Sequence, residues 1–171
     1  MSAQPQGYHD EVDRIVDAWR LARPDLDVAP LHVFSRITRI ARMLDLARRR
    51  AFARHGIEGW EFDVLSALRR AGEPLTPGRL IADTLVSSGT MTNRIDRMVT
   101  HGLVVRSPDP SDRRVVHVQI TDLGIEKVDA AISDLVADEA VLLEAVGGEG
   151  AQDLGELLKA LLVPLEAGAS D

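Results

Sequence analysis

The spacing of apolar residues predicts a mainly helical chain that contains one pair of strands. Apolar side chains recur every three or four positions, the spacing that places them on one face of an α-helix. This spacing predicts helices over residues 10–23, 30–55, 60–70, 75–84, 88–101, 122–146 and 154–165. Valine and isoleucine dominate residues 103–106 and 115–121, which favours two β-strands. The predicted fold class is therefore mainly α with a small β-hairpin.

The hairpin is predicted from alternation and from its turn. In the second strand Val116, Val118 and Ile120 alternate with His117 and Gln119. The two strands are joined by a segment that holds two prolines and two aspartates and ends in two arginines, PDPSDRR, residues 108–114. Proline and aspartate favour turns, so we expect a hairpin with a basic tip.

Two short helices are predicted just before the hairpin. In the first, Thr76 is a suitable N-cap and Pro77 suits the first helical position. The second is expected to begin with Ser87 or Ser88 as its cap and to end at Gly102. Its apolar face consists of Met91, Ile95, Met98 and Val99, and its polar face of Thr90, Thr92, Asn93, Arg94 and Arg97. A polar helix followed at once by a hairpin tipped with arginines is typical of a winged helix-turn-helix, whose second helix enters a major groove.

The candidate DNA contacts divide by chemistry. Ser88, Thr90, Thr92 and Asn93 are expected at base edges, because the first turns of a recognition helix approach the bases most closely. Arg97 is expected at phosphate, and the wing residues Arg113 and Arg114 in the adjacent minor groove, with Asp112 pairing with Arg114. A polar helix face that only contacts solvent is the simpler alternative. The hairpin and the preceding helix together favour contact with DNA.

The same residues resemble a known family. The segment DRRVVHVQIT fits the pattern D-x-R-x-x-x-V-x-[LI]-T through Asp112, Arg114, Val118, Ile120 and Thr121, which resembles the wing of MarR-type transcriptional regulators. The preceding SSGTMTNRIDRMVTHGLVVR resembles their recognition helix. The resemblance covers nearly the whole chain.

The resemblance implies three regions and a dimer. Residues 1–55 would form N-terminal helices on the dimerisation and ligand side, 56–121 the winged helix-turn-helix, and 122–171 the C-terminal dimerisation helices. A homodimer would place two reading heads about 34 Å apart on a pseudo-palindromic operator in double-stranded DNA. Repression of transcription is what the family suggests.

Four further residues resemble the urate-responsive branch of the family, the HucR-like and PecS-like repressors. That branch carries a tryptophan in an extra N-terminal helix, an aspartate before the reading head, and arginines in the recognition helix and at the start of the wing. This chain has Trp19, Asp63, Arg94 and Arg106 in those places. The resemblance implies an effector such as urate or another purine, whose anion would be bound by the arginines and repelled by Asp63, so that the recognition helix moves.

Each of the four residues also has a simpler interpretation. Trp19 suits the buried side of a short helix, Asp63 is favourable near a helix N-terminus, and Arg94 suits a phosphate. A phenolic or antibiotic effector and a metal-sensing regulator are the alternatives to urate.

The net charge of −7 is unevenly distributed along the chain. Residues 1–30 carry −3, residues 31–121 carry +6 and residues 122–171 carry −10. Eighteen of the twenty basic residues are arginine, which suits forked contacts to phosphate and guanine. Residues 31–121 are thus basic within an acidic chain, and the acidic C-terminal region is expected to lie away from DNA or against basic helices of the assembly.

Several function classes lack their signatures. The chain has no cysteine, which excludes disulfides and thiolate chemistry. It has no glycine-rich phosphate loop or nucleophile elbow, so we expect no enzyme, no catalytic residues and no cofactor. Its five histidines show no metal-ligand spacing, so no metal site is expected. Without a long apolar run or a signal sequence, we expect a cytoplasmic protein with no membrane partner.

Overall fold

A computed structural model describes residues 9–84, 86–109, 112 and 115–168. Its contacts divide the chain into two compact units, Met1–Arg50 and Ala51–Asp171. Among the described residues, no helix is long and apolar enough to cross a membrane.

The first unit holds α1 (Glu11–Ala22) and most of α2 (Leu31–Arg54), whose last turn belongs to the second unit. Asp10 caps α1 by accepting bonds from the backbone N–H groups of residues 12 and 13. Val12 and Val16 are buried against Val28. Trp19 is 47% exposed, so the expectation that it lies on the buried side of its helix is wrong within the single chain. The small core of this unit contacts the helix through the two valines instead.

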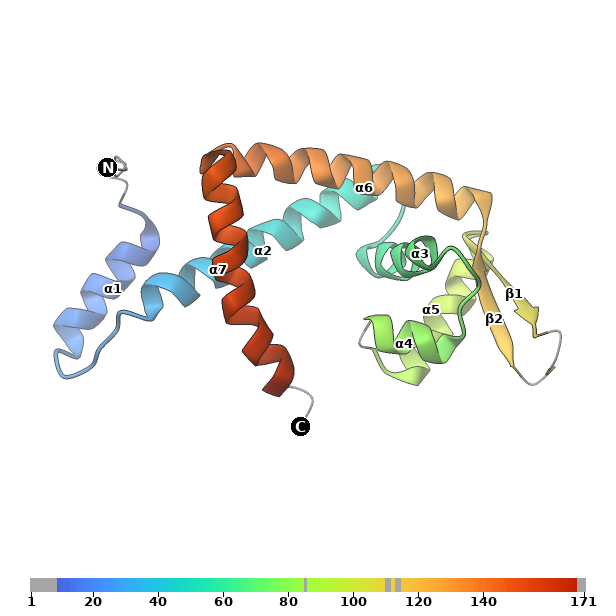
Figure 1. Ribbon diagram of the computed structural model, residues 1–171, viewed down its shortest axis with the longest axis horizontal. Coiled ribbons are helices and arrows are strands. Elements are labelled where there is room, and N and C mark those ends of the chain that lie inside the picture. The colour runs from blue at the N-terminus through green and yellow to red at the C-terminus, as the bar shows by residue number, and fades with distance from the viewer. Residues whose placement is uncertain (1–8, 85, 110–111, 113–114, 169–171) are drawn as a thin grey trace. The chain divides into compact units, whose positions relative to one another are not determined.

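The second unit contains the reading head and two long C-terminal helices. Its elements are α3 (Gly59–Ala71), α4 (Pro77–Thr84), α5 (Ser88–Thr100), β1 (Val104–Pro108), β2 (Val116–Ile120), α6 (Asp122–Leu143) and α7 (Gly147–Gly168). In Figure 1, α4 and α5 lie beside α3, and the β1–β2 hairpin follows α5. This order confirms a mainly α fold with a winged helix-turn-helix.

Local sequence explains where these elements begin and end. Thr76 accepts a bond from the N–H of Arg79 at the start of α4, and Ser87 accepts one from the N–H of Thr90 at the start of α5. Gly102 has a φ of 70°, a left-handed conformation that glycine adopts without strain, and it ends α5 as predicted. The strands are antiparallel, with Val104 opposite Ile120.

The core of the second unit lies between the reading head and α6. Its largest fully buried apolar side chains are Leu65, Leu68, Leu80, Met91, Ile95, Met98 and Leu103. The inner face of α5 is therefore as predicted, except for Val99, which is 39% exposed. Successive residues are rotated by about 100° around the helix axis, so Val99 points farther from Met98 than Met91 and Ile95 do. It lies at the edge of the buried stripe.

The last two helices differ in how far they are buried. On α6, Val128, Ala131 and Leu135 join the core, whereas α7 has no buried residue among those described. The expectation that the final helix begins near residue 154, after the glycine-rich segment, is wrong. The chain turns over residues 144–146 and α7 begins at Gly147, whose φ is 71°. Interior glycines weaken a helix by only about 1 kcal/mol each, which α7 tolerates.

Candidate nucleic-acid interface and ligand hollows

The first turns of α5 present short polar side chains to solvent. Ser88, Thr90, Thr92 and Asn93 are all exposed. The Thr92 hydroxyl donates to the carbonyl of Ser88 at 3.1 Å, and the Thr90 hydroxyl lies 2.9 Å from that of the capping Ser87. These bonds fix hydroxyl orientation while leaving lone pairs for a donor from outside. The surface has the size and chemistry to contact base edges.

The base of the wing is held by Asp109. Its Oδ2 lies 2.8 Å from Nε2 of His117 on β2, and its Oδ1 accepts the backbone N–H of Asp112 at 3.0 Å. Asp112 is exposed. Arg113 and Arg114 lie outside the described residues, so their minor-groove role and the pairing of Arg114 with Asp112 remain predictions.

A hollow of about 260 Å³ lies between the start of α3 and the outer face of α5. It is lined by Trp60 and by the α5 residues Thr90, Asn93, Arg94 and Arg97. The guanidinium carbon of Arg97 lies 4.8 Å from the centre of the Trp60 ring, and that of Arg94 lies 5.5 Å from it. Both distances are within the range of cation–π attraction. The tryptophan therefore gathers two cations of the recognition helix at one aromatic face.

Glu58 completes this cluster. One carboxylate oxygen accepts the indole N–H of Trp60 at 2.8 Å and the other accepts an N–H of Arg97 at 2.6 Å. Hydrogen bonds from Trp60 and Arg97 hold the pKa of Glu58 below its ordinary value. The bond to Glu58 uses one of the five guanidinium N–H groups of Arg97, which leaves others to meet the phosphate predicted for it.

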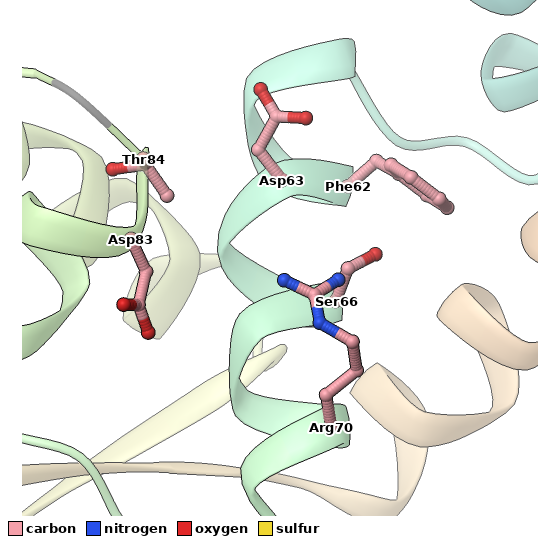
Figure 2. A pocket seen from close by; sticks show the side chains of 6 residues that line it. All are labelled: Phe62, Asp63, Ser66, Arg70, Asp83 and Thr84. Atoms are coloured by element: carbon pink, nitrogen blue, oxygen red, sulfur yellow. The ribbon is translucent and has the colours of Figure 1, made fainter. Parts of the chain in front are cut away.

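A second hollow, of about 290 Å³, lies between α3 and α4. Figure 2 shows the α3 residues Phe62, Asp63, Ser66 and Arg70 on one side, and the α4 residues Asp83 and Thr84 on the other. Asp83 also accepts a bond from Arg79 at 3.2 Å, and the Thr84 hydroxyl donates to the carbonyl of Leu80. With two carboxylates and one guanidinium, the hollow suits a ligand that carries hydrogen-bond donors.

The four predicted ligand residues are distributed over different places. Asp63 lines the α3–α4 hollow, and Arg94 lines the hollow at Trp60. Arg106, on β1, lines neither of these two hollows and donates to the carboxylate of Asp96 on α5. Trp19 belongs to the first unit. A shared site for all four therefore remains a prediction.

A set of contacts between the start of α3 and the end of α5 is not predicted from the sequence. Glu61 is only 2% exposed, and its carboxylate accepts the N–H of Glu58 at 2.8 Å and lies 2.9 Å from Nδ1 of His101. The signal was present in Glu61 ahead of an apolar run, which is the glutamate position of a capping box, although Glu58 stands where that pattern usually has serine or threonine. Trp60 was counted only as part of a compact helix.

The described residues hold no group of three or more histidine, aspartate or glutamate side chains arranged to bind a metal ion.

Comparison with known proteins identifies similar regulators. A model of the MarR family matches residues 55–115. The HTH-type transcriptional regulator PecS of Dickeya dadantii is 34% identical over 150 residues, which cover 86% of this chain and 90% of that protein. The HTH-type transcriptional regulator MhqR of Bacillus subtilis is 29% identical over 130 residues, covering 75% and 88%.

Solved structures give the same result. A mutant of MarR from E. coli complexed with operator DNA aligns with a TM-score of 0.65 at 25% identity, covering 90% of this chain and 99% of that one. AbsC, a MarR family transcriptional regulator from Streptomyces coelicolor, aligns with a TM-score of 0.74 at 22% identity, covering 85% and 98%. The likeness to AbsC supports the fold alone.

Proposed function

Because the chain belongs to the MarR family of transcriptional regulators, we propose that it is a repressor that binds a pseudo-palindromic DNA operator as a homodimer. A small aromatic anion such as urate releases it. The observation that carries DNA binding is the exposed polar start of α5, set on a buried core and followed directly by a hairpin. The family consists of regulators and the protein is not an enzyme.

The dimensions of α5 suit a major groove. An α-helix with its side chains is about 10–12 Å in diameter, and a B-DNA major groove is about 12 Å wide, so the thirteen residues of α5 can enter it. Ser88, Thr90, Thr92 and Asn93 would contact base edges, while Arg97 and the wing arginines would bind the backbone and the minor groove. Asn93 is the strongest candidate for sequence readout, because an amide can pair with adenine through two hydrogen bonds.

The homodimer is supported by apolar surface that the single chain leaves uncovered. On α7, Leu154, Leu157, Leu158, Leu161, Leu162 and Leu165 are between 39% and 66% exposed. Their spacing of three and four residues forms one stripe along the helix. A second copy of the chain would remove this stripe from water and would also supply the second reading head.

The effector response is supported by the positions of Asp63 and Arg94 on the two helices whose relative placement matters most. Asp63 is exposed on α3, and Arg94 lies on α5 with its guanidinium over Trp60. Asp63 and Arg94 line different hollows, so the proposed anion would bind Arg94 in a state that brings the Asp63 carboxylate near it. The carboxylate would then repel the anion, and movement of α5 would relieve the repulsion. The effector and the operator would then weaken each other's binding by the same factor.

DNA binding is tested by selecting duplexes from a random pool with the wild-type protein. Asn93→Ala should lower affinity for the selected duplex about tenfold and relax the preference at one position, because one base contact contributes about 1–3 kcal/mol. Arg114→Ala should weaken binding to all duplexes and lower the salt slope by about 1. Recovery of no preferred sequence would contradict the proposal.

The effector is tested by titrating urate into the complex with the selected duplex. We expect release of the duplex by wild type and a weaker response in Asp63→Ala and Arg94→Ala. Asp129→Asn is the matched control. Asp129 lies on α6, binds Arg69 on α3 and lines neither hollow. Urate is excluded as the effector if it leaves both thermal stability and DNA binding unchanged. A thermal-shift screen of aromatic acids would then identify the class of ligand.

A further inference from the structure

Glu61 is a buried acid that the proposed function does not use. Its side chain is 3% exposed, and it lies in the first turn of α3. Burying a carboxylate is costly unless hydrogen bonds and an opposite charge compensate it. A glutamate at this point therefore needs partners, and the partners show what it does.

One partner lies in α3 and the other at the end of the recognition helix. The backbone N–H of Glu58 donates to one oxygen at 2.8 Å, which caps α3. Nδ1 of His101 lies 2.9 Å from the other oxygen, and His101 is the C-terminal cap residue of α5. One carboxylate thus joins the first turn of α3 to the last turn of α5.

Charged groups surround this bond. The carboxylates of Glu61 and Glu58 face it from α3, and Arg97 lies one turn earlier on α5, bound to Glu58 at 2.6 Å. The two bonds, Glu61–His101 and Glu58–Arg97, lie one helical turn apart along α5. Two attachment points on one helix restrict its rotation, whereas a single point would leave a pivot.

We propose that Glu61 and His101 are positioning residues for DNA recognition. Their bond fixes the C-terminal end of α5 on α3 and thereby sets the angle at which the first turns of α5 meet the bases. The proposal rests on the DNA binding proposed above. Neither residue is among the predicted DNA contacts, so the pair would act through the helix that it holds.

This role predicts an effect on sequence discrimination rather than on general affinity. Binding to any duplex depends mostly on contacts to phosphate, whereas preference for one sequence depends on the fit of side chains to base edges. A misplaced α5 would lose base contacts and keep much of the phosphate attraction. Loss of the bond should therefore lower the ratio of operator affinity to random-duplex affinity.

If Glu61 acted through its charge alone, its replacement would not lower the affinity ratio. Removing a negative charge from the reading head would strengthen binding to every duplex, because DNA is an anion. A loss of folding stability would reduce binding to both duplexes in parallel. The ratio of the two affinities separates positioning from both of these effects.

The experiment compares full-length variants on the duplex selected by wild type and on a random duplex of equal length. His101→Ala and Glu61→Ala should each lower the affinity ratio about tenfold, the loss of roughly one base contact. Glu61→Gln should restore part of the ratio, because its amide oxygen can accept the N–H of Glu58 while its NH2 group can donate to an unprotonated Nδ1 of His101. The double variant should lose no more than either single one. Asp129→Asn, which breaks the ion pair of α3 with α6, should leave the ratio unchanged.

An unchanged ratio in both alanine variants, or parallel losses on the two duplexes, would overturn the positioning role and leave the proposed function intact. If Glu61→Ala does not fold, His101→Ala decides the question, because the histidine side chain is half exposed and its loss leaves no apolar cavity. If wild type selects no sequence at all, the proposed function itself fails.

Discussion

At the scale of single residues, the carboxylate of Glu58 binds the last turn of the recognition helix, α5. Glu58 binds both the indole of Trp60 and the guanidinium of Arg97, and Arg97 also lies over the tryptophan ring. Arg97 thus keeps a fixed position before any DNA arrives. A side chain ordered in advance loses less conformational entropy when it binds phosphate. If Arg97 binds phosphate as proposed, the cluster would prepare that contact as well as stabilise the fold.

The cluster gives thermal stability a specific dependence on pH. Its hydrogen bonds lower the pKa of Glu58 in the folded protein below the usual 4.5, so the unfolded chain binds a proton at higher pH than the folded one. The stabilisation is complete above the usual pKa and is lost as pH falls through the lowered one. We expect Glu58→Gln to melt below wild type at pH 7 and the difference to shrink as the pH falls below about 4.5.

Thermal unfolding from pH 7 to pH 3 checks this expectation. Glu73→Gln, which removes an exposed acid after α3, serves as the control for a simple loss of charge. A difference between Glu58→Gln and wild type that stays constant over this range would show that the carboxylate is not held by its partners.

The sequence predicts residues that begin or end their own helix, such as Ser87 and Gly102 at the two ends of α5. It missed Glu58, Trp60, Glu61 and His101, whose contacts join positions about forty residues apart. A single sequence contains no direct record of which distant side chains meet. Val99 and Trp19 were placed inside because each is apolar on a helix, whereas burial depends on how far the neighbouring elements extend.

At the scale of elements, α6 packs unusually close to the hairpin. A Cβ atom added to Gly124 would lie 2.3 Å from the carbonyl oxygen of Leu103 and 2.8 Å from a side-chain carbon of Ile120. Both distances require atoms to move, and the contact with the carbonyl oxygen of Leu103 requires movement of the backbone. Gly124 therefore allows the first turn of α6 to lie directly on the start of β1 and the end of β2.

Gly124→Ala should destabilise the second unit by about 2 kcal/mol, the usual cost of overpacking a core. Gly155→Ala is the matched control, because that glycine is also helical and nothing lies within 4 Å of the added carbon. The control should be more stable than wild type by about 0.5–1 kcal/mol. Urea unfolding of the two variants measures both changes, and equal stability of the two would contradict the close packing.

The order of elements was predicted well because each carries a local signal, such as the caps of α4 and α5 and the alternation in β2. α7 begins seven residues earlier than predicted, because its glycines continue the helix although glycine disfavours a helix interior. Of the glycines at the start of α7, only Gly147 has a positive φ, and the sequence alone does not distinguish it from the others.

At the scale of the whole molecule, the single chain leaves two features incomplete. The leucine stripe on α7 is exposed, and one reading head would contact only half of the proposed pseudo-palindromic site. A two-fold dimer would complete both, because it covers the stripe and supplies the second head. The sequence showed only that apolar faces require a partner.

Leu158→Asp combined with Leu161→Asp should convert the dimer to a monomer, because two charges would enter a buried apolar interface. Light scattering after gel filtration measures the mass. Affinity for the selected duplex should fall at least a hundredfold, because the two half-sites no longer bind together. Gln152→Asp, on the opposite side of α7 by helical periodicity, should remain dimeric. A monomeric wild type would contradict this arrangement.

The most direct test of the central claim is the fluorescence anisotropy of the selected duplex, titrated with wild-type protein at fixed salt. We predict saturation at two chains per duplex, with an affinity at least a thousandfold above that for a random duplex of equal length. Equal affinity for the two duplexes would contradict the claim that α5 reads a sequence.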